Sequence, residues 1–146
     1  MVARGFTLIV CATALLACAS ENIRDLSGRP RFNRYAGRTV HLHRPAYLIE
    51  EDFWTGPQYA LSEQANMKGA LRQPLPVGHP IHLDSVKINP AFSPYALALG
   101  HTFVPALGKE VSFHYYWAAP DGFGRAPWEP NSVPEFEFFK DPAFLR

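Results

Sequence analysis

Three histidines have the spacing and the surroundings of a metal site. His41 and His43 lie two residues apart in 38–43, where apolar and polar residues alternate as in a half-buried strand, so both side chains leave the same face. His82, on a neighbouring strand, would add a third imidazole, and three such ligands with an open fourth position make a catalytic zinc site. The simpler interpretation is that all three are polar residues on solvent-facing strand surfaces. Because strand pairing is needed to decide, the zinc site remains a hypothesis.

Acidic and aromatic residues stand together in one loop-like segment: Glu50, Glu51, Asp52, Phe53, Trp54 and Tyr59. Paired carboxylates can cleave glycosidic bonds, but a run of acids in a loop is more typical of a solvated surface. Flat rings in loops offer contact area at small entropic cost, so Phe53, Trp54 and Tyr59 are predicted to bind a peptide or a glycan. The competing interpretation places the same rings in the core, since a small domain needs buried area.

Other catalytic patterns are weak in this chain. The Gly-x-Ser-x-Gly elbow that presents a serine nucleophile is absent from the sequence. Asp84-Ser85 is related to His82 only by adjacency. Gly122-Phe-Gly124 lacks the strand and helix that would make it a phosphate-binding loop. The sequence therefore predicts no catalytic residue and no cofactor.

The elements that would position these residues are mostly short strands. Apolar residues make up 47% of the 146 residues, aromatic residues 14%, and the 14 prolines disfavour long helices. Strand-like segments are expected at 38–43, 46–49, 59–61, 81–88, 95–104 and 111–117. The apolar face slips between Leu83 and Val86, which predicts a bulge, and Gly100 marks a strand pair or one bent strand. A helix is expected only at 62–71.

These segments predict an all-β domain over 35–117, built as a small antiparallel barrel or sandwich. The stretch Leu75-Pro-Val-Gly-His-Pro80, followed by a strand to Ile88, resembles a hairpin of bacterial SH3-like barrels. That resemblance covers one hairpin and implies an SH3-like form of the barrel.

The segment 118–146 differs from the rest because prolines alternate with large aromatic residues. A solvated linker rarely carries so many large rings. We expect an extended arm that packs back over the barrel and covers a sheet edge. An aromatic surface for a partner is the alternative.

The N-terminal segment has the features of a targeting signal. Arg4 precedes an uncharged apolar run too short for an ordinary membrane-spanning helix. Leu15-Leu16-Ala17-Cys18 resembles the lipobox of bacterial lipoproteins. Two other interpretations stay open: Ala17-Cys18-Ala19 also fits ordinary secretory cleavage before Ser20, and the run could be a buried helix of a cytosolic protein.

The lipoprotein resemblance implies removal of residues 1–17, a diacylglyceryl group on the Cys18 thiol and an acylated new amino terminus (palmitate-type chains). Two acyl chains give stable membrane binding. Ala19, rather than Asp, implies sorting to the outer membrane, facing the periplasm. Residues 18–34 would then be the lipidated cysteine and a flexible tether.

Processing at Cys18 also changes the composition of the chain. It removes Cys11 and Arg4, leaving 14 − 1 = 13 basic against 13 acidic residues and no free thiol. A nearly neutral chain lacks the basic field that nucleic-acid binding requires.

These features together predict a non-catalytic envelope lipoprotein that binds an envelope protein or a cell-wall component. A lipid-anchored cell-wall or metal-dependent hydrolase is the first alternative. An inhibitor or immunity-type lipoprotein is the second.

Overall fold

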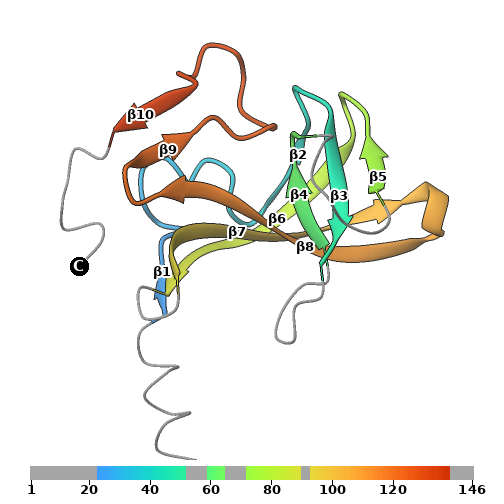
Figure 1. Ribbon diagram of the computed structural model, residues 1–146, viewed down its shortest axis with the longest axis horizontal. Coiled ribbons are helices and arrows are strands. Elements are labelled where there is room, and N and C mark those ends of the chain that lie inside the picture. The colour runs from blue at the N-terminus through green and yellow to red at the C-terminus, as the bar shows by residue number, and fades with distance from the viewer. Residues whose placement is uncertain (1–22, 52–58, 65–71, 90–92, 139–146) are drawn as a thin grey trace, which may run out of the picture.

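The computed structural model describes residues 23–51, 59–64, 72–89 and 93–138, and its architecture is all-β (Figure 1). The strands are β1 (Arg24–Asp25), β2 (Arg38–His41), β3 (Ala46–Glu50), β4 (Tyr59–Ser62), β5 (Arg72–Leu75), β6 (Pro80–Asn89), β7 (Ser93–Val104), β8 (Lys109–Ala119), β9 (Gly122–Gly124) and β10 (Phe136–Phe138). The 3-10 turn η1 (Pro105–Leu107) is the only helical element among the described residues. The all-β prediction is confirmed.

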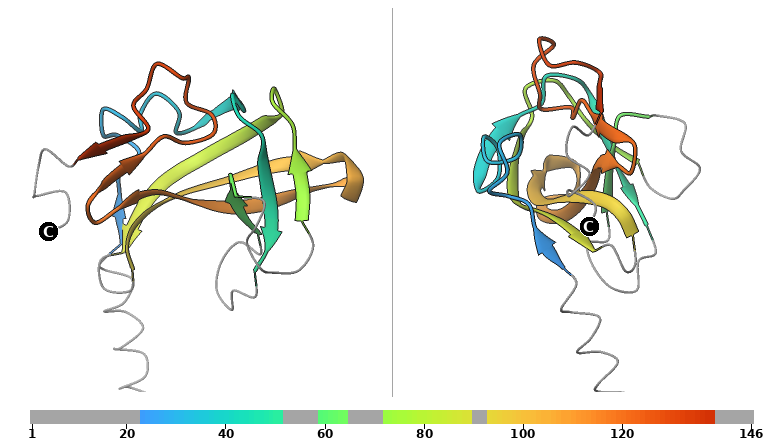
Figure 2. Two further views of the ribbon diagram at one scale, coloured as in Figure 1. Left: turned by 45° about the horizontal axis from the view of Figure 1, so that its top comes forward. Right: turned by 90° about the vertical axis from the view of Figure 1, so that its left-hand side faces the viewer.

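All these strands belong to one sheet. Its main path runs β1-β6-β7-β8-β4-β3-β5, with β2 also on β6, β9 on β8 and β10 on β9. Figure 2 shows β6, β7 and β8 extending along the molecule, with the shorter β3, β4 and β5 at one end. The sheet is mixed, because β4 and β8 pair in parallel while the other ladders are antiparallel.

The sequence predicts a small antiparallel barrel or sandwich, with an SH3-like form of the barrel, whereas the described part of the structure is one mixed sheet that does not close into a barrel. Within the described residues β5 pairs with β3 alone, so the sheet stays open at that strand. Pro74 lies within β5 and has no N–H to donate, which suits an edge strand and disfavours a further partner.

The core lies on one face of this curved sheet. The strand predicted at 111–117 is confirmed as part of β8, where Val111, Phe113 and Trp117 are buried and Tyr115 on the same face is partly buried. Trp117 is fully enclosed: its ring centroid lies 4.8 Å from that of Phe32 and 4.9 Å from that of Trp128. Residues from both ends of the described chain therefore meet around one tryptophan.

The tether predicted at 18–34 is wrong from Arg24 onward, where the chain is part of the folded domain. Strand β1 begins at Arg24 and pairs with β6, and Leu26 and Phe32 are both buried in the core. The segment is polar on average, but Leu26, just after β1, and Phe32, in the turns that follow, are both packed over the sheet. Their burial outweighs the polar character of their neighbours.

The C-terminal segment is part of the same fold up to residue 138. β8 continues to Ala119 and forms a hairpin with β9, so the expected boundary at 117 falls inside a strand. Ala126 and Trp128 are fully buried, as expected of an arm that packs back, whereas Phe136 and Phe138 in β10 are exposed. Residues 139–146 lie outside the described residues.

The long β6–β7 hairpin confirms two local predictions. A register shift falls between Leu83 and Ser85, where the apolar pattern slips. β7 is a single strand that passes through Gly100, whose hypothetical Cβ would lie 2.3 Å from the His82 carbonyl oxygen. The predicted helix at 62–71 is wrong at its start, because Ser62 ends β4; residues 65–71 lie outside the described residues.

Within the part of the chain that the structure describes, no helix has the length and apolar character needed to cross a bilayer.

Candidate functional site

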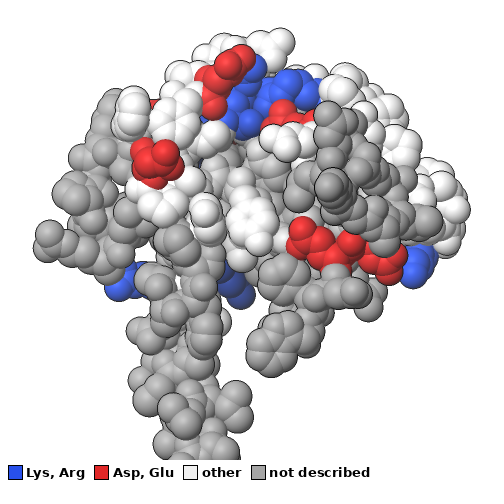
Figure 3. Space-filling model, in the orientation of Figure 1, with Lys and Arg blue, Asp and Glu red and all other residues white. Residues whose placement is uncertain are grey.

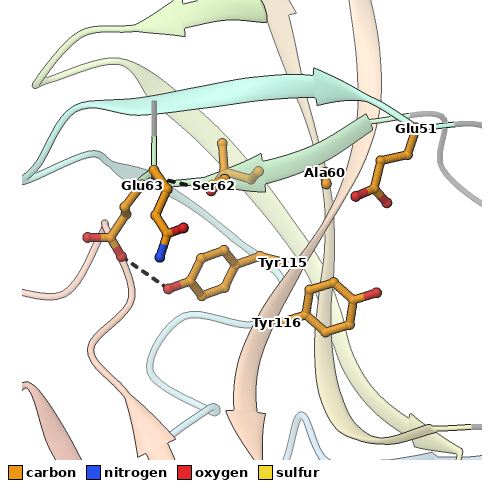
Figure 4. A pocket seen from close by; sticks show the side chains of 8 residues that line it. Glu51, Ala60, Ser62, Glu63, Tyr115 and Tyr116 are labelled. Carbon is orange, nitrogen blue, oxygen red and sulfur yellow. Dashed lines mark hydrogen bonds between the residues drawn. The ribbon is translucent and has the colours of Figure 1, made fainter. Parts of the chain in front are cut away.

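A pocket of about 310 Å³ opens where β4 and β8 part from one another (Figure 4). The two strands pair only at Tyr59–Phe113 and Ala60–His114, although both continue beyond those pairs. The pocket is lined by Glu51, Ala60, Leu61, Ser62, Glu63, Gln64, Tyr115 and Tyr116. Its volume is at the lower end of the range for small-molecule sites, about 300–1,000 Å³.

Successive residues of β8 supply two different tyrosines to this pocket. Tyr116 is 47% exposed and stands nearly perpendicular to the rings of Tyr95 and His114, at 5.5 and 5.4 Å between centroids. Tyr115 is half-buried and packs edge-on against Trp128. The Tyr116 ring is therefore both accessible and held in one orientation.

The carboxylate of Glu63 closes one end of the pocket. It accepts a hydrogen bond of 2.9 Å from Arg44 Nε and another of 3.1 Å from the Tyr115 hydroxyl (Figure 4). Burial, and secondly the charge of Glu63, raise the pKa of Tyr115 far above its usual value. Tyr115 thus remains a protonated donor, and Arg44 compensates the charge of Glu63.

Glu51 lies at the other end, beside a buried imidazole. Glu51 Oε2 is 3.3 Å from His114 Nε2, and the His114 side chain is only 5% exposed against 25% for Glu51. Burial lowers the pKa of His114, and this effect exceeds the opposing influence of the Glu51 carboxylate. At neutral pH the imidazole is therefore uncharged, and within the described part of the chain it gives Glu51 no positive partner.

The pocket has a definite chemical character. Of the described side chains that line it, two are carboxylates and none is a lysine or arginine. Carboxylate oxygens accept hydrogen bonds from cationic and hydroxyl groups, and the exposed face of a tyrosine attracts cations. The arrangement is suited to binding a small ligand that is not an anion.

The aromatic residues predicted to bind a ligand are only partly placed. Tyr59 is 7% exposed and belongs to the core cluster, so the prediction that it binds a ligand is wrong. Tyr59 lies two residues from Leu61 in β4, so its ring shares the face of that core residue. Phe53 and Trp54 lie outside the described residues.

The zinc site predicted from His41, His43 and His82 does not form. His41 and His82 do lie on paired strands, but His43 follows β2, where its backbone N–H donates to the Pro127 carbonyl. His82 instead stacks on His101, 4.8 Å between ring centroids. Among the described residues no group of three or more His, Cys, Asp or Glu is placed to hold a metal ion.

A second cluster of charged groups holds the two ends of the fold together. Arg31 donates to both carboxylate oxygens of Glu129 and also to Glu137. Arg44 donates to the carbonyls of Arg125 and Ala126. In Figure 3 basic and acidic side chains adjoin at the top of the view, whereas acidic side chains form a separate patch lower on the right.

Most residues of the pocket carry no local sequence signal. The sequence indicates Glu51 only as one member of an acidic run and does not indicate a role for His114. Glu63 and Tyr116 were not singled out. The signal that could have found them is the pairing of β4 with β8, which joins segments more than fifty positions apart.

Cys18, the residue predicted to carry lipid, lies outside the described residues. Comparison with known proteins gives no match: no family model, no curated protein and no solved structure is similar to this chain.

Proposed function

We propose that this chain is a lipid-anchored envelope protein whose β-domain binds another envelope component without catalysing a reaction. The observation that carries the proposal is the pocket between β4 and β8, whose lining includes the exposed ring of Tyr116 and two carboxylates. A site of this kind offers contact area and hydrogen-bond acceptors to a ligand.

The anchor fixes where the domain would work. Arg24, the first residue of β1, follows Cys18 by six positions, so the chain between them reaches at most about 20 Å. Lipid on Cys18 would hold the pocket close to the bilayer surface, on the periplasmic side of an outer membrane. A partner in the same membrane or in the adjacent cell wall is within reach.

The side-chain contacts favour binding over hydrolysis. A glycoside hydrolase needs one carboxyl group poised as an acid, usually in an apolar environment. Glu63 is instead an ion-pair partner of Arg44, and Glu51 adjoins His114. Ser62 Oγ accepts a hydrogen bond from the Gln64 N–H, as in a turn. These contacts make Glu63, Glu51 and Ser62 fixed hydrogen-bond acceptors, as in a binding site, rather than a catalytic acid or a nucleophile.

The proposal is tested by capture from envelope extracts with the lipidated full chain. We expect a specific envelope component to be retained, and expect less of it with a variant carrying both Glu51→Gln and Tyr116→Leu. Glu50→Gln is the matched control, because Glu50 adjoins Glu51 but does not line the pocket. Turnover of cell-wall fragments by the purified protein, with no component retained, would overturn the proposal in favour of a hydrolase.

A further inference from the structure

We infer that the pocket between β4 and β8 is a site for an organic ammonium group, which Glu51 holds against the ring of Tyr116. The inference rests on the proposed binding function and names the chemistry of the ligand.

The charge balance within the pocket selects the sign of the ligand. Glu63 has its counter-ion built in, since Arg44 Nε lies 2.9 Å from its carboxylate. Among the described residues Glu51 is paired with the buried imidazole of His114 at 3.3 Å, whose lowered pKa leaves it neutral at pH 7. A charged carboxylate that is three-quarters buried beside a neutral partner gains from a cation that takes the place of water. An anion would be repelled by both carboxylates.

The aromatic lining selects an organic cation over a metal ion. Apart from the two carboxylates, the described lining consists of two tyrosine rings, two neutral polar residues and two apolar residues: Tyr115, Tyr116, Ser62, Gln64, Ala60 and Leu61. No group of three metal-ligating side chains occurs among the described residues. A tyrosine face attracts ammonium groups whose centre lies within about 6 Å of the ring centroid. The perpendicular contacts with Tyr95 and His114 hold that ring still, so little entropy is lost on binding.

The size and openness of the site match a headgroup or the end of a side chain. A volume of about 310 Å³ accommodates a small ammonium compound or one amino sugar, and excludes a folded partner domain. Lipid headgroups, amino sugars and the free amines of cell-wall peptides all carry the required group. The experiment below separates these sources.

His114 makes the site sensitive to pH. The imidazole faces Glu51 and the Tyr116 ring, while its neighbours across the sheet, Ala60 on β4 and Leu99 on β7, are uncharged. When His114 takes up a proton in acid, it compensates Glu51 and competes with the ligand. We therefore expect ammonium binding to weaken as the pH falls from about 7.5 to about 5.5.

The test is calorimetric titration of the full chain with choline and with its neutral carbon isostere, 3,3-dimethylbutan-1-ol. We expect choline to bind at least tenfold more tightly than the isostere at pH about 7.5. Glucosamine against N-acetylglucosamine and ethanolamine against ethylene glycol form two further matched pairs, and the tightest cation identifies the source of the ligand. Equal binding of the members of every pair, or no binding of any cation below about 10 mM, would overturn the inference.

The variants distinguish the roles of the side chains. Glu51→Gln is expected to weaken choline binding about tenfold, because a hydrogen bond to a charged group is lost, whereas Glu50→Gln leaves it within twofold. Tyr116→Leu should weaken it two- to fivefold, and Tyr116→Phe, which keeps the ring, should restore it. His114→Gln should remove the pH response. Unchanged thermal unfolding of each variant shows that it is folded.

The outcome is separable from that of the proposed function. Capture of an envelope component without any preference for ammonium compounds would contradict this inference alone. If the mature protein from its own cells binds ammonium compounds but carries no lipid on Cys18, the envelope proposal alone is contradicted.

Discussion

Arg31 and Glu129, which lie 98 positions apart, form a two-bond ion pair that joins the two ends of the fold. Arg31 Nε lies 3.2 Å from Glu129 Oε1, and its terminal nitrogen lies 3.0 Å from Oε2. The same carboxylate accepts from the Ala126 N–H at 2.7 Å, and Arg31 lies over the ring of Phe123. Because Glu129 is 1% exposed, removing either partner leaves a buried group without its complement.

Glu129→Gln is therefore expected to lower the free energy of unfolding by about 2–4 kcal/mol, since a buried ion pair loses one charge. Urea denaturation followed by tryptophan fluorescence measures the change. Glu135→Gln is the matched control, because Glu135 also pairs with an arginine but is 87% exposed, and it should have little effect. Equal effects of the two variants would show that the buried pair does not hold the ends together.

Trp128 is expected to be essential to the core although it lies in the proline-rich C-terminal segment. It is 1% exposed and packs against Trp117 and Tyr115. Trp128→Ala should cost about 3–5 kcal/mol of stability, as for other large aromatic residues removed from a core. Phe138→Ala, at a ring that is 73% exposed, should cost much less. Thermal unfolding of both variants decides the matter, and a stable Trp128→Ala protein would contradict the packing.

Gly100 is expected to tolerate no side chain. A Cβ there would lie 2.3 Å from the His82 carbonyl oxygen and 2.8 Å from Phe113 Cζ, so backbone and core would both have to shift. Gly100→Ala should destabilise the protein by about 1–3 kcal/mol or more. Gly28→Ala, where nothing lies within 4 Å, should change stability by less than about 0.5 kcal/mol. Denaturant midpoints compare the two, and an unaffected Gly100→Ala variant would refute the close approach of β6 and β7.

Stability should fall as the solution is acidified below neutral pH. Burial lowers the pKa of His79 and of His114 from the ordinary value of 6.5. The unfolded chain therefore binds protons at these positions more readily than the folded chain, and unfolding is favoured as the pH falls below about 6.5. Denaturation curves between pH about 7.5 and about 5.5 measure the slope. His114→Gln should reduce it and His41→Gln, at an exposed position, should not; the reverse order would contradict this assignment.

The strand pattern of the fold could be predicted where one face is packed and the other is wet. The alternation in β8 correctly assigns Val111, Phe113 and Trp117 to the core. The slip after Leu83 correctly indicates the irregularity in β6. Period-two alternation fails for His114, which is buried although it points away from the core face. A residue buried on the second face of a sheet has no signature in alternation alone.

The candidate site could not be predicted, because it depends on long-range pairing. Glu51 follows β3, Glu63 follows β4 and Tyr116 belongs to β8, and they meet only because β4 pairs in parallel with β8. Short sequence patterns can predict hairpins and turns. Two parallel strands are joined by a long connection, so no short pattern predicts that they pair. Phe32 falls within the predicted tether for a similar reason, because its burial depends on a long-range contact with Trp117 of β8.

The most direct test of the envelope account is intact-mass spectrometry of the mature protein purified from the membranes of the organism that makes it. The account predicts a chain that begins at Cys18 and carries the mass of a diacylglyceryl group and an amide-linked acyl chain. A mature chain with a free Cys18 thiol, or one that still begins at Met1, would contradict the anchor and the envelope role that depends on it.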